Sequence, residues 1–484
     1  MAKTVFQSYY DDPKNHAKDI NIYAYHSPSH GRVKIQGMYF EGTDYRTVER
    51  YEEYKECGFN TVLAQTGGNY AGEPWEESKA KFVLDLCQQA GIDKVIILDE
   101  WLRLLSLQQS TLIGEGDIMT QNGQQVFRPR FKDEAELDAY VKDRMAPYVD
   151  HPSFYGVQLI DEPGRECFKA IGQLYRSIKR VYPKVHAQVN IRSMFFRFVT
   201  GGLPDYNEEW DFNDRYKAYV EEFLDETGAD YVLTDRYPYH EGIGNDVYPY
   251  YYLSFQILSE IARERNVTLH FVLQSFGSYI NGKRTYRMPN EGELKLQVHT
   301  SLGFGIQEFA YYTYWGGGYY EMVGEYRPKN EAIVSADGNR TEAYPIVQKL
   351  NMMTHKLAPV IKNFKHVADT YAAVSPIKSK AIHLQFTRRG KLLMAEKFTV
   401  NQELGFVSEM YDEEKDQYLY VMQNITSSLH CPDIGRQKLS LTFKGDVTKV
   451  DVFDGNEWHT EDLSEDKTYY IELDSGDAVY LMPY

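Results

Sequence analysis

The chain has few cysteines, no long apolar run and fewer positive than negative charges. Its four cysteines, Cys57, Cys87, Cys167 and Cys431, show no CxxC pairing and no metal-ligand spacing, which argues against a zinc site or a disulfide framework. No run reaches the ~18 apolar residues that a membrane span needs. The 53 basic residues are outnumbered by 70 acidic ones, for a net charge of −17. This balance argues against nucleic acid or an anionic membrane surface as a partner.

Two further absences concern targeting and cofactors. The first residues contain no apolar segment of the kind that a signal peptide carries, so we expect a reduced, cytoplasmic setting. No glycine-rich phosphate loop follows the first expected strand, and Gly316-Gly317-Gly318 lacks the strand-to-helix context of one. We therefore expect no nucleotide, redox cofactor or metal.

Strand-like and helix-like patterns alternate along most of the 484 residues. Eight short apolar runs are expected to form strands: Val33–Phe40, Phe59–Gln65, Val95–Leu98, Phe154–Ile160, Val185–Ile191, Tyr231–Thr234, Thr268–Leu273 and Ile306–Tyr312. Each is followed by a stretch with helical spacing: Arg46–Cys57, Glu76–Ala90, Asp133–Val149, Cys167–Val181, Asn213–Glu226, Tyr250–Arg265, Glu291–Leu302 and Tyr344–Ile361. Eight such units predict an α/β fold with a closed (β/α)₈ TIM barrel, and the alternative is a doubly wound open sheet.

The pattern changes after about residue 365. Short runs with a period of two follow, separated by turn signals such as Asp454-Gly455-Asn456 and Ser475-Gly476-Asp477. They predict a small C-terminal antiparallel β-sandwich. The predicted domains are an N-terminal arm packed on the barrel (1–32), the barrel (33–363) and the sandwich (364–484).

The segment with the most chemical information is the end of the fourth expected strand. Its apolar run leads into Asp161-Glu162-Pro163. Proline cannot continue a strand ladder, so both carboxylates are expected at the C-terminal end of the strand. Active sites of α/β barrels form at that end. A pair of acids at a strand end also fits a salt bridge to a barrel arginine, and both interpretations stay open.

The other expected strand ends carry amides, carboxylates and aromatic rings. Amides and carboxylates hydrogen-bond sugar hydroxyls, and aromatic rings stack on the apolar faces of sugars. This composition predicts a carbohydrate ligand. The residues expected to bind it are Gln65, Asn69, Glu100, Asn190, Arg236, Tyr237, Gln274, Tyr312 and Trp315.

Glycoside hydrolysis needs a protonated carboxyl next to the leaving oxygen and a second group across the anomeric carbon. Glu162 is the candidate acid, because neighbouring Asp161 and partial burial would raise its pKa. Asp235, at the end of the sixth strand, is the next carboxylate along the barrel. An ion pair with Arg236 or Arg192 is the structural alternative for Asp235.

These segments resemble β-galactosidase-like (β/α)₈ glycoside hydrolases of gut bacteria, a group of clan A barrels. The resemblance is carried by Phe154-Tyr155-Gly156 with Asp161-Glu162-Pro163, by Asp235-Arg236-Tyr237-Pro238, and by Tyr312-Thr313-Tyr314-Trp315. It covers most of residues 33–360, and the tail is similar to the β-sandwich that follows such barrels. The resemblance implies a glycosidase that acts on a small oligosaccharide or glycoside, with Glu162 as acid/base.

One departure from that family concerns the second catalytic group. Retaining clan A enzymes carry a nucleophilic glutamate at the end of the seventh strand, where this chain has Gln274. An amide cannot form the glycosyl ester. Three hypotheses follow. Asp235 supplies the second carboxylate; or the acetamido group of an N-acetylhexosaminide substrate attacks, with Asp161 orienting it; or the barrel is an inactive sugar-binding or scaffold protein. The 41 tyrosines are also compatible with a homo-oligomer.

Overall fold

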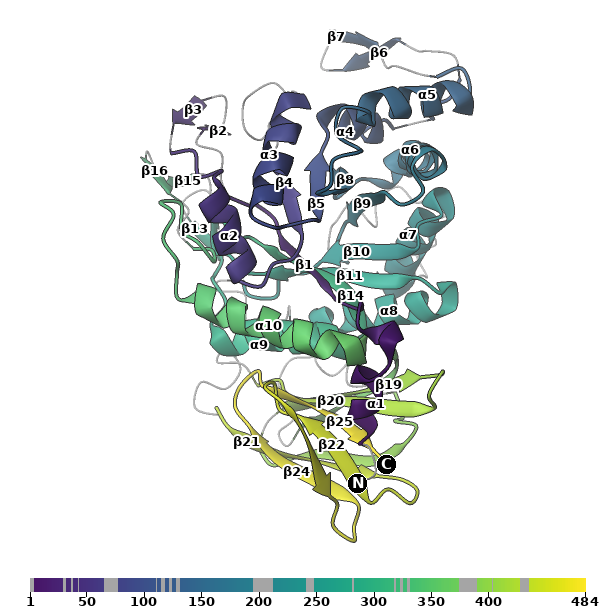
Figure 1. The fold of residues 1–484 in the computed structure, drawn as a ribbon, viewed down its shortest axis with the longest axis vertical. Coiled ribbons are helices and arrows are strands. Elements are labelled where there is room, and N and C mark those ends of the chain that lie inside the picture. The colour runs from purple at the N-terminus through teal and green to yellow at the C-terminus, as the bar shows by residue number, and fades with distance from the viewer. Residues whose placement is uncertain are drawn as a thin grey trace.

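The computed structural model describes residues 4–28, 32–35, 38–41, 43–64, 77–109, 111–114, 118–121, 124–127, 131–194, 212–240, 248–280, 283–316, 319–322, 325–328, 331–373, 390–402, 404–426 and 435–484. In this part of the chain, a barrel of parallel strands ringed by helices sits on a smaller, all-β unit (Figure 1). The α/β fold class predicted from the alternating pattern is confirmed, as is the β-sandwich that follows it.

The barrel sheet has eight parallel strands in the order β1-β14-β11-β10-β9-β8-β5-β4. The first and last strands in this order lie close together. The backbone N–H groups of Asn60 and Thr61, just before β4, both donate to the carbonyl of Ile22 on β1. The eight strands are β1 (Asn21–Ala24), β4 (Val62–Ala64), β5 (Val95–Leu98), β8 (Phe154–Asp161), β9 (His186–Ile191), β10 (Tyr231–Asp235), β11 (Thr268–Gln274) and β14 (Ile306–Tyr312).

The predicted first strand is wrong. The barrel begins with β1, whose four residues pair in parallel with Glu308–Tyr311. Part of the run Val33–Phe40 instead forms an antiparallel hairpin of β2 (Arg32–Ile35) and β3 (Met38–Glu41). Gly37 interrupts that run, and a glycine inside a strand pattern indicates a turn. The first barrel strand therefore lies among the residues assigned to the N-terminal arm.

Helices follow the strands where the spacing predicts them. They are α2 (Val48–Glu56), α3 (Glu77–Gln89), α5 (Glu134–Met145), α6 (Phe168–Val181), α7 (Phe212–Thr227), α8 (Tyr248–Arg265), α9 (Glu291–Gly303) and α10 (Ala343–Ile361). The short helices α1 (Val5–Tyr10) and α4 (Glu100–Ser106) and the 3₁₀ turns η1 (Pro13–Asn15) and η2 (Arg165–Cys167) were not predicted. No helix in these described ranges is long and apolar enough to cross a membrane.

Three more hairpins extend the connections between barrel strands and helices. They are formed by β6 (Ile118–Gln121) with β7 (Gln124–Phe127), β12 (Ser278–Ile280) with β13 (Lys283–Tyr286), and β15 (Tyr319–Met322) with β16 (Glu325–Pro328). Because each follows the C-terminal end of a barrel strand, they build up that face of the barrel. Figure 1 shows β13, β15, β16 and the β2–β3 hairpin on one side of the molecule.

The C-terminal unit contains a six-stranded and a three-stranded antiparallel sheet. The larger sheet has the order β17-β19-β20-β25-β22-β23 and the smaller one β18-β21-β24. Apolar side chains such as Val407, Met422, Leu441 and Val479 are buried between them. The strands are β17 (Lys365–Ala373), β18 (Ala395–Val400), β19 (Leu404–Asp412), β20 (Gln417–Asn424), β21 (Gln437–Phe443), β22 (Lys449–Phe453), β23 (Trp458–Asp462), β24 (Thr468–Leu473) and β25 (Ala478–Pro483). A further strand predicted at Lys380–Phe386 lies outside the described residues.

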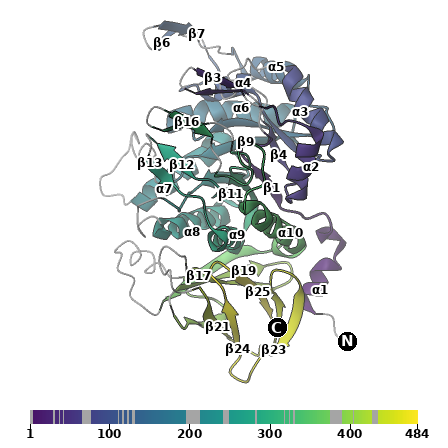
Figure 2. The same cartoon turned by 90° about the vertical axis from the view of Figure 1, so that its left-hand side faces the viewer.

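Helices α9 and α10 lie between the barrel and the sandwich (Figure 1), and α1 lies beside the sandwich (Figure 2). The hydroxyl of Tyr480 lies 2.8 Å from Nδ1 of His299 on α9. The hydroxyl of Tyr9 on α1 donates to Asp412 at 2.8 Å, and the amide of Phe6 donates to Asp451 at 3.0 Å. The N-terminal helix thus donates hydrogen bonds to two carboxylates of the sandwich.

Candidate active site

The C-terminal ends of neighbouring barrel strands bring three carboxyl groups to one face. Asp161 is the last residue of β8, Glu162 follows it directly, and Asp235 is the last residue of β10. Between these two strands lies β9, whose Asn190 is the register partner of Asp161. All strands of the barrel sheet are parallel. These residues therefore share the face on which barrel enzymes carry out their chemistry.

Asp161 is exposed to solvent and is held by its neighbours. The side-chain amide of Asn190 donates to its Oδ1 at 2.9 Å. Desolvation by the surrounding protein raises the pKa of Asp161, while hydrogen bonds from Asn190 and the Tyr25 hydroxyl lower it. Because solvent reaches this carboxylate, we take its desolvation to be weaker than that of buried Asp235. Asp161 is thus an oriented carboxylate that a ligand can contact.

Glu162 has an uncommon backbone conformation. Its φ is +49°, in the left-handed region, which residues other than glycine seldom adopt and which is enriched at functional sites. Its N–H donates to the carbonyl of Asn190 at 2.7 Å, and its carbonyl accepts from Nε of Arg192 at 2.7 Å. Two hydrogen bonds from β9 and the residue after it therefore fix the turn that ends β8.

The Glu162 carboxyl is only partly exposed. Burial, followed by the negative charge of Asp161, raises its pKa to about 7, and Arg192 opposes this rise. A group with such a pKa is protonated in a substantial share of molecules at neutral pH. It can donate a proton there, as general acid catalysis requires.

Asp235 is buried, with 6% of its surface exposed. Burial and then the charges of Glu162 and Asp161 raise its pKa well above the usual value, and a hydrogen bond with Tyr237 opposes them. Its Oδ1 has no hydrogen-bond partner in the structure, and no ion pair of Asp235 is found among the described residues. An ion pair with Arg236 or Arg192, the structural alternative for Asp235, is thus not observed.

Aromatic rings from four barrel strands or the loops after them surround the carboxyl groups. Tyr312, at the end of β14, lies at the centre of this group. Its ring centroid is 5.7 Å from that of Tyr25, 5.7 Å from Tyr237 and 5.0 Å from Phe276. Tyr25 and Tyr237 also hydrogen-bond Asp161 and Asp235, respectively. The rings therefore position the acids and supply the apolar faces on which a sugar ring can stack.

Gln274 is fully buried, and its side chain binds backbone. Its amide oxygen accepts from the N–H of Tyr239 at 2.9 Å, and its amide nitrogen donates to the carbonyls of Tyr239 and Arg287 at 3.1 and 2.9 Å. The glutamine at the end of β11 thus fastens two loops of the barrel face. Because both the oxygen and the nitrogen of its side-chain amide are hydrogen-bonded to backbone, Gln274 has a structural role.

Two other predicted ligands also have structural partners. Trp315 is 1% exposed and packs against Tyr45, with ring centroids 4.8 Å apart. Glu100 begins α4 and forms two hydrogen bonds to the guanidinium of Arg103, at 2.9 and 2.6 Å. Neither is among the residues that the structure gathers around Asp161 and Asp235.

The remaining predicted residues fall into two groups. Arg236 lies next to Asp235, and burial lowers its pKa to about 10. Asn190, Tyr237 and Tyr312 lie at the carboxyl groups as described above. Gln65 and Asn69 lie outside the described residues.

Sequence reasoning missed Tyr25, which follows β1 and binds Asp161. The available signal was the alternation in Ile20–Tyr25, a run too short to stand out beside Val33–Phe40. As for ions, no group of three or more His, Cys, Asp or Glu side chains that could hold a metal is found in the part of the chain that the structure describes.

Comparison with known proteins finds distant structural likenesses. No protein-family model matches the chain, and no curated protein matches it. Among solved structures, a GH39 enzyme from Xanthomonas axonopodis pv. citri aligns at 11% identity and a TM-score of 0.40, over 90% of this chain and 89% of that one. An endo-β-1,4-mannanase from Thermotoga petrophila aligns at 11% identity and a TM-score of 0.40, over 94% and 97%. A β-D-glucuronidase from Dictyoglomus thermophilum aligns at 13% identity and 0.41, over 69% and 50%. Similarities this distant carry no argument about activity.

Proposed function

We propose that this protein is a glycoside hydrolase that cleaves a terminal sugar from a small oligosaccharide or glycoside, with Glu162 as the general acid/base. The observation that carries the proposal is the set of three carboxyl groups at the ends of β8 and β10 among aromatic rings. One of them, Glu162, is partly exposed and has a pKa of about 7. A carbohydrate is the ligand class that fits carboxylates, an amide and stacked rings together.

In the proposed reaction, the Glu162 carboxyl donates its proton to the glycosidic oxygen as the bond from the anomeric carbon to that oxygen breaks. The aglycone leaves as an alcohol, and Glu162 is left as a carboxylate. In the second half of a retaining reaction, that carboxylate takes a proton from the water that attacks the anomeric carbon. Both protons are accounted for, and Glu162 returns to its starting state.

The second group across the anomeric carbon is the open part of this proposal. Asp235 is one candidate, but a nucleophile must be ionised. Burial and the charges of Glu162 and Asp161 raise the pKa of Asp235, which disfavours its ionised form. Asp161 is exposed and oriented by Asn190 and Tyr25. This observation favours the substrate-assisted alternative, in which Asp161 orients the acetamido group of an N-acetylhexosaminide and that group attacks.

A screen of nitrophenyl glycosides and natural disaccharides tests the proposed activity. Turnover by the wild-type protein that falls sharply in Glu162→Gln is the expected result. If no glycoside is turned over and Glu162→Gln binds sugars as the wild-type protein does, the protein is an inactive sugar-binding or scaffold protein instead. The cytoplasm is the proposed setting, because small glycosides can be imported whole.

Two measurements separate the candidates for the second group. Inhibition by a thiazoline analogue of an acetamido sugar, together with loss of activity in Asp161→Asn, would support substrate assistance. Recovery of Asp235→Gly activity on addition of azide would support Asp235 as the nucleophile, because the small anion replaces a missing carboxylate.

A further inference from the structure

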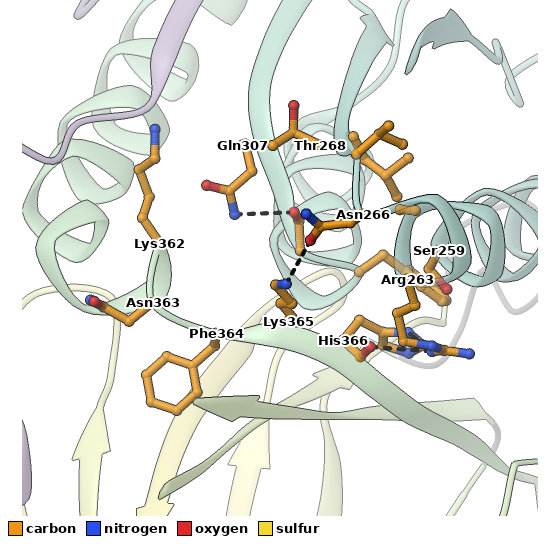
Figure 3. Close-up of a pocket in the computed structure, with 15 residues that line it drawn as sticks. Ser259, Arg263, Asn266, Thr268, Gln307, Lys362, Asn363, Phe364, Lys365 and His366 are labelled. Atoms are coloured by element: carbon orange, nitrogen blue, oxygen red, sulfur yellow. Dashed lines mark hydrogen bonds between the residues drawn. The ribbon is translucent and has the colours of Figure 1, made fainter. Parts of the chain in front are cut away.

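A cavity lies at the end of the barrel opposite the three carboxyl groups, where the strands begin and the sandwich is attached. Its volume is about 210 Å³, below the roughly 300–1,000 Å³ of pockets that bind drug-sized molecules. It is lined by the end of α8, the start of β11, the α9–β14 turn and the α10–β17 connection (Figure 3). A cavity of this size suits a small ligand and is too small for an oligosaccharide.

Three basic side chains line this cavity, and no acidic residue does. They are Arg263, Lys362 and Lys365. Figure 3 shows Lys365 pointing toward Asn266, with Gln307 nearby, and Arg263 extending beside His366. In a chain with a net charge of −17, three cations around one small cavity are a local reversal of the overall charge.

These cations contact uncharged oxygen atoms, and Arg263 also lies 3.5 Å from Nδ1 of His366. Lys365 Nζ donates to Oδ1 of Asn266 at 3.1 Å, Lys362 Nζ to the carbonyl of Asp19 at 2.8 Å, and Arg263 to the carbonyl of His366 at 3.2 Å. In the described part of the chain none of the three cations is found within ion-pair distance of a carboxylate.

Further charges near the cavity have partners of their own. Asp19 lies 2.7 Å from His355, and Asp369 lies 3.4 Å from His366, which lines the cavity. Glu308 lies 3.4 Å from His270. Another cation, Lys18, donates to Oδ1 of Asn363, a wall residue, at 2.5 Å. Burial lowers the pKa of Lys362, and repulsion from Lys94 and Lys18 adds to this effect, although Glu308 and Asp19 oppose it. The positive charge around the cavity is therefore only partly balanced by the protein.

We propose that this cavity binds a small oxyanion of the phosphate class at the junction of the barrel and the sandwich. Phosphate oxygens accept hydrogen bonds from lysine, arginine and side-chain amides, which are the donors that the wall offers. The cavity joins α8 and β11 of the barrel to β17 of the sandwich. A bound anion would therefore link the two units and stabilise the folded protein by mass action.

The test uses the full chain and two probes, inorganic phosphate and glucose 6-phosphate, in isothermal titration calorimetry and thermal unfolding. Sodium chloride keeps the ionic strength constant. We expect saturable binding and a rise in Tm with phosphate. Tighter binding of glucose 6-phosphate would identify a phosphorylated sugar as the ligand, and tighter binding of inorganic phosphate would identify the free anion.

Lys365→Ala and Arg263→Gln are each expected to weaken phosphate binding by roughly ten- to a hundred-fold, as the loss of a hydrogen bond to a charged group does. Lys365→Arg keeps the charge and should retain binding, which separates loss of the site from misfolding. Lys397→Ala removes an exposed lysine of β18 and should bind as the wild type does. Binding that is absent in the wild type, equal in Lys365→Ala, or reproduced by chloride at equal ionic strength would overturn the proposal.

Discussion

The pKa values of buried carboxyl groups are shifted in opposite directions at the two ends of the barrel. At the end where the strands begin, Glu308 on β14 is 1% exposed and lies 3.4 Å from His270 and 3.9 Å from His186. Asn21 donates to its other oxygen at 2.8 Å. Burial alone would raise the pKa of Glu308, but these partners outweigh it and lower the pKa to about 2. At the other end, Asp235 is also buried, and its charged neighbours include two more carboxyl groups, so its pKa rises.

The difference separates an end of the barrel that stabilises the fold from the end at which we propose that the chemistry takes place. A carboxylate with complementary partners contributes to stability in its ionised form. Carboxyl groups placed beside each other disfavour ionisation, and the protein tolerates that cost where a proton must be held for a reaction. Four predictions test this comparison.

The largest expected effect is on activity. Replacing Glu162 by glutamine removes the proton donor and should lower kcat/KM by about 10²–10⁴-fold, with the circular dichroism spectrum unchanged. The loss should be smallest for a nitrophenyl substrate, because its leaving group needs little protonation. Glu166→Gln, in the same loop and exposed, is the matched control. Equal activity of the two variants would remove Glu162 from the mechanism.

At the opposite end, the expected effect is on stability. Glu308→Gln removes a buried carboxylate whose ionised form its neighbours stabilise. It should lower the free energy of unfolding by about 3 kcal/mol at neutral pH, measured by urea denaturation. The folded pKa lies below the unfolded value, so this stability is present above the unfolded pKa and is lost as the pH falls toward about 2. Glu396→Gln on the exposed edge of β18 should leave stability unchanged. A Glu308→Gln variant that is as stable as the wild type would contradict the comparison.

Asp235→Asn should act in the opposite direction. A carboxyl whose folded pKa is raised costs stability once the pH exceeds its unfolded pKa, and a neutral amide avoids that cost. Asp235→Asn should therefore have a higher Tm than the wild type at pH 8, by roughly 1 °C for each kcal/mol gained in a chain of this length, and a reduced activity. The gain should shrink as the pH falls through about 4, because Asp235 then becomes protonated in the unfolded chain as well. A lower Tm at pH 8 would show that the ionised form of Asp235 is stabilised after all.

The smallest expected effect is a shift in the pH profile. A general acid must be protonated, so kcat/KM should fall as the pH rises through about 7, the pKa of Glu162. Asp161→Asn removes the negative charge that helps to raise this pKa. The alkaline limb should therefore move to lower pH by about 1 unit, in the activity that remains. A limb that stays in place would assign the titration to another group.

The sequence predicted seven of the eight barrel strands because each is a short apolar run followed by an amphipathic helix. The exception, β1, is only four residues long, and its place is set by parallel pairing with β14, nearly 290 residues away in the chain. A local pattern cannot reveal a pairing of that separation. Val33–Phe40, the stronger run, therefore took its place in the prediction.

The residues of the candidate site could be predicted from the sequence in part. Asp161, Glu162 and Asp235 follow recognisable strands, so their common face could be inferred before their contacts were known. Which strand-end residues point into the site could not be inferred. Gln274 and Trp315 follow strands just as Asp161 does, yet one binds loop backbone and the other is buried against Tyr45.

By itself, the sequence determined the order of strands and helices, and with it the face of the barrel on which Asp161, Glu162 and Asp235 lie, because periodicity and strand ends are local properties. Only the tertiary structure decided the protonation of these groups and of Glu308. A pKa depends on burial and on charges brought close in space, and the neighbours that matter, such as Glu162 for Asp235 and His270 for Glu308, lie on other strands.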